Sequence, residues 1–198
     1  MNRTTQLRYD TVKAQAISHF VTILGRATHA DLQAARVWYN EAREFAASLM
    51  VHRPEWSMQV AASVVSAFSP RVTWAHNKAK ALQYAQGITP KGLTAHVLNA
   101  EACEFHGFGA LNGPKTNAFA RAIAGDSGAV VVDVWMCRAA GLTFTKGKRT
   151  GEAKDSPTKV EYRAIADAIR ALAATPTVCM EPATLQALLW IVIRGKSN

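Results

Sequence analysis

The chain has 198 residues, of which 49% are hydrophobic and 19% charged, a balance that indicates a folded globular protein and excludes a disordered one. Lysine and arginine (23) outnumber aspartate and glutamate (14), which gives a formal net charge of +9. A compact body with this charge attracts polyanions, so nucleic acid is the first partner that we expect.

The three cysteines, Cys103, Cys137 and Cys179, lie far apart in the sequence. They exclude a disulfide framework and a C-x-x-C metal site, and we expect them to be buried in a reducing compartment. The six histidines are scattered too, so we predict no protein-bound metal and no cofactor.

The N-terminus lacks an apolar signal core, and the longest apolar run, 187–193, is too short to cross a bilayer. We therefore expect a cytoplasmic protein with no membrane partner.

Apolar residues recur at helical spacing along nearly the whole chain, and the only strand-like run is 130–132. The predicted fold class is therefore all-α, in one domain that spans residues 1–198. In chain order we predict helices over about 8–25, 30–50, 55–68, 73–86, 94–104, 114–124, 132–141, 158–174 and 182–194.

The segment 143–157 is the one long stretch without periodicity, and it carries four basic residues. We predict an exposed loop. It is either a solvated connector or a flexible arm that contacts phosphates.

A glycine-rich hairpin is predicted between the helices at 94–104 and 114–124. Gly109 and Gly113 allow a tight turn, and Pro114 suits the first position of the second helix because its missing N–H has no helical partner there. The turn amides and the N-terminal end of that helix would then face outward as donors for a phosphate oxygen. The result is a helix–hairpin–helix motif over about 94–124.

This arrangement resembles the helix–hairpin–helix DNA glycosylase superfamily (HhH-GPD), which includes the endonuclease III and 8-oxoguanine glycosylase branches. Gly113-Pro-Lys115-Thr116 stands at the G-x-K-T positions of the family hairpin, and Val132-Asp133 stands in the family's V-D-x-H-x-x-R segment, here within 131–141. Lys115 and Asp133 are 133 − 115 = 18 residues apart, as in the family pattern. A weaker similarity extends upstream to Ser66 and to Asn77-Lys78, so the resemblance covers about 55–142.

The resemblance implies a two-lobed helical fold and a reactive pair. Lys115 would attack the sugar C1′ and expel the base, forming a Schiff base that permits strand cleavage by β-elimination. Asp133 would stabilise the developing positive charge on the sugar. Because an amine must lose its proton to act as a nucleophile, we expect Lys115 to be buried, with Arg121 and Arg138 as neighbouring cations. Taken singly, a first-turn lysine is also typical of phosphate contact and an aspartate at a helix start is typical of an N-cap.

Further residues are predicted to contact a duplex whose target base is flipped out. The expected DNA contacts are Gly109, Gly113, Thr116, Arg121, Arg138, Arg71, Asn77 and Lys78. The expected base pocket or wedge consists of Phe68, Trp135 and Gln186. Phe68 and Trp74 have an alternative place in the core, and the helix of Gln186, Trp190 and Arg194 has an alternative interpretation as a buried helix whose polar stripe only packs.

Four departures from the family pattern limit what the resemblance implies. Leu111 replaces the first hairpin glycine, Gly109 the leading leucine, Trp135 the histidine of the aspartate segment, and Phe68 a base-probing glutamine. The cysteine cluster that holds an iron–sulfur centre in endonuclease III-type members is absent from the sequence. The target base is therefore not predicted.

Three functions follow as hypotheses. The first is base excision with strand cleavage by a monomeric enzyme in a bacterial cell or a phage-infected host. The second is transfer of an amine or amino-acid group to activated thymine-type bases, as carried out by glycosylase-like proteins of bacterial viruses. The third is a non-catalytic DNA-binding module that keeps the hairpin only to hold phosphates, with affinity that falls as salt rises.

Overall fold

The computed structural model describes residues 2–195 of the chain, and within that range it is helical with no strand. The all-α prediction is confirmed. The described residues form two compact units, each with its own buried core: unit 1 comprises residues 2–38 and 130–195, and unit 2 comprises residues 39–129. The boundary falls inside helix α2 (His29–Leu49), which contributes residues to both units.

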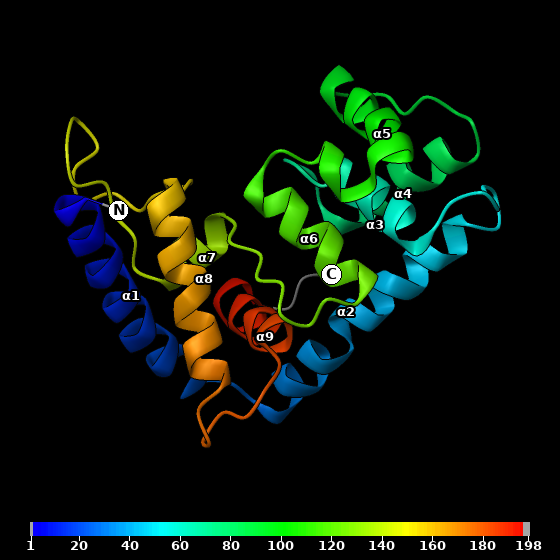
Figure 1. Ribbon diagram of the computed structural model, residues 1–198. Coiled ribbons are helices and arrows are strands. Elements are labelled where there is room, and N and C mark those ends of the chain that lie inside the picture. Colours follow the sequence, from blue (N-terminus) through cyan, green and yellow to red (C-terminus); the bar gives the residue numbers. More distant parts are fainter. Residues whose placement is uncertain (1, 196–198) are drawn as a thin grey trace. The chain divides into compact units, whose positions relative to one another are not determined.

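Unit 1 is built from the two ends of the chain. Helix α1 (Arg3–Leu24) packs beside α8 (Lys159–Ala173), and α9 (Pro182–Arg194) packs against both (Figure 1). The short helix α7 (Val134–Ala139) contacts α9 and α1. The buried side chains between these helices are apolar and include Phe20, Met136, Ile165 and Leu189. Burial of such side chains stabilises the unit by about 1.5–3 kcal/mol each.

Unit 2 is organised around helix α3 (Met58–Ala67), whose last seven residues are all buried. Helices α4 (Trp74–Ala85), α5 (Thr94–His106) and α6 (Pro114–Ala124) pack against it (Figure 1). Alanine, serine and valine dominate α3, and these small side chains let its neighbours approach closely. The hairpin between α5 and α6 is therefore held on a buried support.

The nine predicted helices are all present, and their ends agree with the prediction to within three residues except at the start of α1. That helix begins five residues earlier than expected, at residue 3 rather than 8. The reason is a local cap, because the Asn2 side chain accepts a hydrogen bond from the Thr5 N–H (2.9 Å).

The segment 143–157 is mostly exposed, as predicted, but it is not a free arm throughout. Isolated bridges join Thr143 to Ala153 and Phe144 to Thr150. Lys154 binds the buried carboxylate of Glu161 at 2.9 and 3.0 Å, and Arg149 pairs with Glu152 at 2.7 Å. Two of its four basic residues are thus engaged within the chain.

Two of the three cysteines are buried, and the helices do not have the length and apolar character of membrane spans within the described range. Cys103 and Cys137 are buried, as expected, whereas Cys179 is exposed in the connection between α8 and α9, where its φ is 45°. The helices within the described range are all too short or too polar to cross a membrane.

Candidate functional site

The hairpin lies where the sequence predicts it, but a different glycine makes the turn. Helix α5 ends at His106, its C-cap Gly107 has a φ of 51°, and a 3₁₀ helix, η1 (Gly107–Ala110), follows. The positive φ favours glycine at position 107, and a Cβ there would also displace the end of the Gln59 side chain, whose nitrogen would lie 2.5 Å away. Gly109 and Gly113 do not have positive φ, and their assignment as the turn glycines is wrong.

A side chain that the sequence analysis missed holds the hairpin together. The Asn117 side-chain amide donates to the carbonyls of Phe108 (2.9 Å) and Leu111 (3.3 Å). Arg121 donates from Nε to Asn117 Oδ1 (2.9 Å), and its guanidinium lies 4.9 Å from the centre of the Phe108 ring. Asn117 lies one turn into α6, where its side-chain amide can donate to carbonyls of the preceding turn. This position of an asparagine is the sequence feature from which its role could have been predicted.

Helix α6 begins without a side-chain cap. Its N-cap is Gly113, followed by Pro114, so the first-turn N–H groups of Lys115 and Thr116 receive no side-chain acceptor. The Thr116 hydroxyl donates to the Gly113 carbonyl (3.0 Å), and Ser66 on α3 donates to the Thr116 carbonyl (2.7 Å). This first turn is fixed in position while its amides remain available to an anion.

Lys115 projects from this turn and is partly exposed. The buried environment that we expected around a neutral lysine is therefore not present in this structure. The reason is its position in the first helical turn, where side chains leave the protein surface.

Asp133 is the N-cap of α7, with its carboxylate held by three donors. Oδ1 accepts the N–H groups of Trp135 (2.9 Å) and Met136 (3.0 Å), and Oδ2 accepts the indole N–H of Trp190 on α9 (3.1 Å). The side chain is partly buried. Such hydrogen bonds fix the direction of a carboxylate.

Three tryptophans and two arginines contact one another in a series that includes Trp190, the indole donor to Asp133, and we call them the tryptophan cluster: Trp38, Trp135, Trp190, Arg138 and Arg194. The Trp38 and Trp190 rings lie 5.4 Å apart. Arg194 lies 4.6 Å from the Trp190 ring centre, and Arg138 lies 4.7 Å from that of Trp135. Flat apolar faces beside guanidinium groups suit nucleobases and phosphates. Of the polar stripe predicted on the last helix, Trp190 and Arg194 reach Asp133 and its neighbours.

The strand-like run 130–132 forms an extended, buried segment that leads into Asp133. The Tyr162 hydroxyl on α8 donates to the Val130 carbonyl (2.9 Å) and accepts from the Val132 N–H (3.4 Å). Burial raises the pKa of Tyr162 to about 12, so the hydroxyl keeps its proton. Tyr162 therefore orients the segment before Asp133, a role that its sequence position did not reveal.

Three predicted contact residues are buried inside the protein. Phe68 is 1% exposed and packs against Tyr84 and His96, which makes it a core residue and not a wedge. Asn77 is 2% exposed on α4 and cannot reach a phosphate. Gln186 is 5% exposed on α9, so it does not present its amide to a base. In each case the burial of a whole helix face overrides the role predicted for one side chain.

The other predicted contacts lie at or near the surface. Arg71 is exposed in the connection between α3 and α4, with a φ of 61°, a conformation that costs a non-glycine residue roughly 1 kcal/mol or more. Lys78 lies 5.6 Å from the Trp74 ring centre, and Arg121 and Arg138 are exposed.

Lys115 belongs to unit 2 and Asp133 to unit 1. Their pairing stays a prediction.

Metal ligands do not gather anywhere in residues 2–195, since no three His, Cys, Asp or Glu side chains come together in a suitable group.

Comparison with known proteins places the chain in a family. Residues 3–197 match the profile of a family of unknown function, DUF7178, and since the match covers nearly the whole chain, the protein belongs to that family. The search of curated proteins and the search of solved structures both found no match.

Proposed function

We propose that this member of a family of unknown function is a DNA-binding enzyme that resembles the helix–hairpin–helix glycosylases and acts at an N-glycosidic bond. The observation that carries the proposal is the Asp133 carboxylate, which three donors hold beside the tryptophan cluster. A fixed negative charge next to flat aromatic faces suits a sugar that becomes positively charged as its base departs.

The hairpin supplies the second part of the proposal. The uncapped first turn of α6, stabilised by Asn117 and Ser66, offers amide donors to a backbone phosphate. The net charge of +9 supports an anionic partner. The side chain of Lys115 leaves the same turn.

In the proposed reaction the Lys115 amine forms a bond to C1′ while the bond from C1′ to the base breaks. The base leaves with the bonding electrons and takes up a proton, and Asp133 stabilises the positive charge on the sugar. Ring opening then gives a Schiff base between Lys115 and C1′, from which β-elimination breaks the strand on the 3′ side. Since Lys115 is partly exposed in the free protein, bound DNA completes the enclosure that the neutral amine needs.

Borohydride trapping tests this proposal. Reduction of the Schiff base on a duplex with an abasic or damaged site links protein and DNA covalently, and we expect that product from the wild type. Lys115→Ala is expected to abolish it, whereas Lys146→Ala, which removes a lysine from the exposed loop, leaves it unchanged. A Lys115→Ala variant that traps as well as the wild type would contradict the role of Lys115.

Asp133→Asn gives the second arm of the test. Asparagine is also a good N-cap, so the fold is retained while the charge is lost. We expect the trapping rate to fall about 100-fold or more, as for loss of one electrostatic group at a transition state. Equal rates would show that the Asp133 carboxylate takes no part in the chemistry, whereas a wild type that binds the duplex without trapping would favour a DNA-binding module without chemistry. Mass spectrometry of nucleosides from DNA made with the protein present separates excision, which leaves abasic sites, from transfer, which leaves a new nucleoside.

A further inference from the structure

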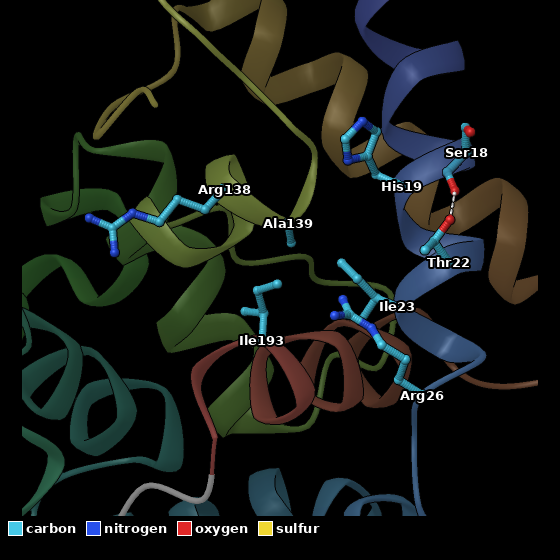
Figure 2. Close-up of a pocket in the computed structure, with 8 residues that line it drawn as sticks. All are labelled: Ser18, His19, Thr22, Ile23, Arg26, Arg138, Ala139 and Ile193. Carbon is cyan, nitrogen blue, oxygen red and sulfur yellow. Dashed lines mark hydrogen bonds between the residues drawn. The ribbon is translucent and has the colours of Figure 1, made fainter. Parts of the chain in front are cut away.

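A pocket of about 240 Å³ lies in unit 1, among side chains from α1, α7 and α9 and from the turn that follows α1. Figure 2 shows the residues that line it: Ser18, His19, Thr22, Ile23, Arg26, Arg138, Ala139 and Ile193. Ala139 is the last residue of α7, and Asp133 caps the other end of that helix. The pocket and the proposed catalytic carboxylate are thus attached to opposite ends of one helix.

The lining of the pocket combines cationic groups, hydroxyls and apolar side chains, without a carboxylate. Arg26 is exposed and makes no ion pair within residues 2–195. His19, Ser18 and Thr22 add polar groups on the exposed face of α1, whereas Ile23, Ala139 and Ile193 supply an apolar surface. A sugar–phosphate backbone presents the matching pair of features, since its phosphate is anionic and its deoxyribose carbons are apolar.

The wall formed by α1 and the end of α7 is held closely together. Gln15 donates to the carbonyls of Ala140 (3.2 Å) and Gly141 (2.6 Å). Gly141 has a φ of 66°, and a Cβ there would lie 2.5 Å from His19 Cε1, so the histidine ring packs directly on the backbone. This part of the pocket is therefore shaped before any ligand arrives.

Arg138 connects the pocket to the tryptophan cluster. It lines the pocket, but Figure 2 shows its side chain extending away from the other lining residues. Its guanidinium lies 4.7 Å from the Trp135 ring centre, two residues beyond Asp133 in sequence. A strand in contact with Asp133 and Trp135 would meet Arg138 on its way to Arg26.

We propose that this pocket binds a backbone phosphate of the DNA strand on which Asp133 acts, with Arg26 as the principal contact. The inference rests on the proposed function, which supplies the strand. The rise of an α-helix puts Ala139 about 9 Å along the axis from Asp133. Since Ala139 lines the pocket, the phosphate belongs to a nucleotide near the target sugar on the same strand.

The test is a DNA-binding titration at several salt concentrations, with a fluorescein-labelled 20-base-pair duplex and fluorescence anisotropy as the readout. Arg26→Ala is expected to weaken binding about fivefold and to reduce the slope of log K against log salt by about 0.9, the loss of one phosphate contact. Arg26→Lys keeps the charge and is expected to keep the slope. Arg3→Ala is the matched control, because Arg3 is an exposed arginine at the start of α1, the helix that leads into the Arg26 turn, and it lies outside the pocket.

Equal affinities and slopes for Arg26→Ala and Arg3→Ala would overturn the inference. Inorganic phosphate provides a second arm. If 10 mM phosphate raises the melting temperature of the wild type and not of Arg26→Ala, while both bind the duplex alike, the pocket takes free phosphate and the assignment to a DNA strand is wrong. Neither arm depends on chemistry at Lys115. A failed borohydride trap together with a reduced Arg26→Ala slope removes the proposed reaction and keeps the phosphate pocket.

Discussion

The two compact units treat their polar groups in opposite ways. In unit 1 the carboxylates are matched inside the chain: Asp133 accepts three hydrogen bonds, and the buried Glu161 binds Arg8, Lys154 and the Thr158 N–H. In unit 2 the first turn of α6 has no side-chain cap, and both ring nitrogens of the buried His96 lack a hydrogen-bond partner among the described residues. At these places unit 1 holds its carboxylates in fixed directions, whereas unit 2 leaves the first-turn amides of α6 without a side-chain cap.

This difference suggests a division of labour. A carboxylate that must stabilise a transition state benefits from a fixed direction, because no reorganisation is then needed during the reaction. Backbone amides that bind a phosphate should have no capping side chain, because that side chain would compete with the phosphate for the same N–H groups. Stability measurements therefore test the hydrogen-bonded carboxylates of unit 1, and DNA-binding measurements test the uncapped first-turn amides of α6 in unit 2.

The largest expected effect comes from breaking the Glu161 network. Burial alone would raise the pKa of Glu161, but the Thr158 N–H, Arg8 and Lys154 together lower it to about 2. Glu161→Gln leaves two cations without their carboxylate and is expected to reduce the free energy of unfolding by about 3 kcal/mol at pH 7, as measured by urea denaturation.

The pH dependence sharpens this prediction. A depressed carboxyl pKa stabilises the fold fully above the unfolded value, near 4.5, and the contribution disappears as pH falls toward 2. The wild type should therefore lose stability across that window, and Glu161→Gln should lose much less. Glu152→Gln, in an exposed pair with Arg149, is the control and is expected to change stability by less than about 1 kcal/mol. Similar urea midpoints for Glu161→Gln and the wild type would show that the network is not stabilising.

The second effect tests whether the open start of α6 matters. Gly113→Asp gives α6 the kind of cap that Asp133 gives α7; the φ of −78° at position 113 suits any residue, and the Thr116 hydroxyl, 3.1 Å from the new Cβ, has to shift slightly. The new carboxylate would occupy the first-turn amides and repel phosphate, so we expect DNA affinity to fall about tenfold, or roughly 1.4 kcal/mol. Thermal stability should rise or stay the same. Undiminished affinity with a measurable gain in stability would remove the hairpin from the proposed interface.

Some features of the two units could be predicted from the sequence, and others could not. The helices and the position of the hairpin were predictable because apolar periodicity and Pro114 are local signals. The turn glycine was not, because Gly107, Gly109 and Gly113 all lie in the hairpin, and the sequence does not show that Gly107 is the one of these three with a positive φ. The sequence predicts that Phe68, Asn77 and Gln186 contact DNA, but the packing of α3, α4 and α9 buries them.

In the candidate site, too, local signals could be predicted from the sequence, whereas contacts between distant segments could not. Asp133 and Lys115 stand out by spacing, whereas Tyr162, Asn117 and Ser66 orient the segments around them through contacts that link separate helices. A single sequence does not reveal which polar side chain will meet which distant carbonyl.

The third effect concerns the unmatched histidine of unit 2. Burial lowers the pKa of His96, and the nearby charge of Lys80 lowers it further, so the ring is neutral in the folded state. Below about pH 6.5 the unfolded chain takes up a proton that the folded chain does not, and stability should fall by up to about 1.4 kcal/mol per pH unit. His96→Phe should flatten this slope below about pH 6.5, and His52→Phe, which replaces an exposed histidine, is the control. An unchanged slope in His96→Phe would assign the acid sensitivity elsewhere.

The smallest effect isolates the orientation of Asp133. Trp190→Phe keeps an aromatic ring beside Trp38 and Arg194 but removes the N–H that donates to Asp133 Oδ2. One neutral donor to a carboxylate is worth about 1 kcal/mol, so the single-turnover rate of adduct formation should fall about fivefold while DNA affinity stays within twofold. In an Asp133→Asn background the same substitution should have little further effect, because the two residues act through one contact. If the two substitutions instead reduce the rate independently, Trp190 contributes through its ring surface, and the carboxylate does not depend on the indole N–H for its direction.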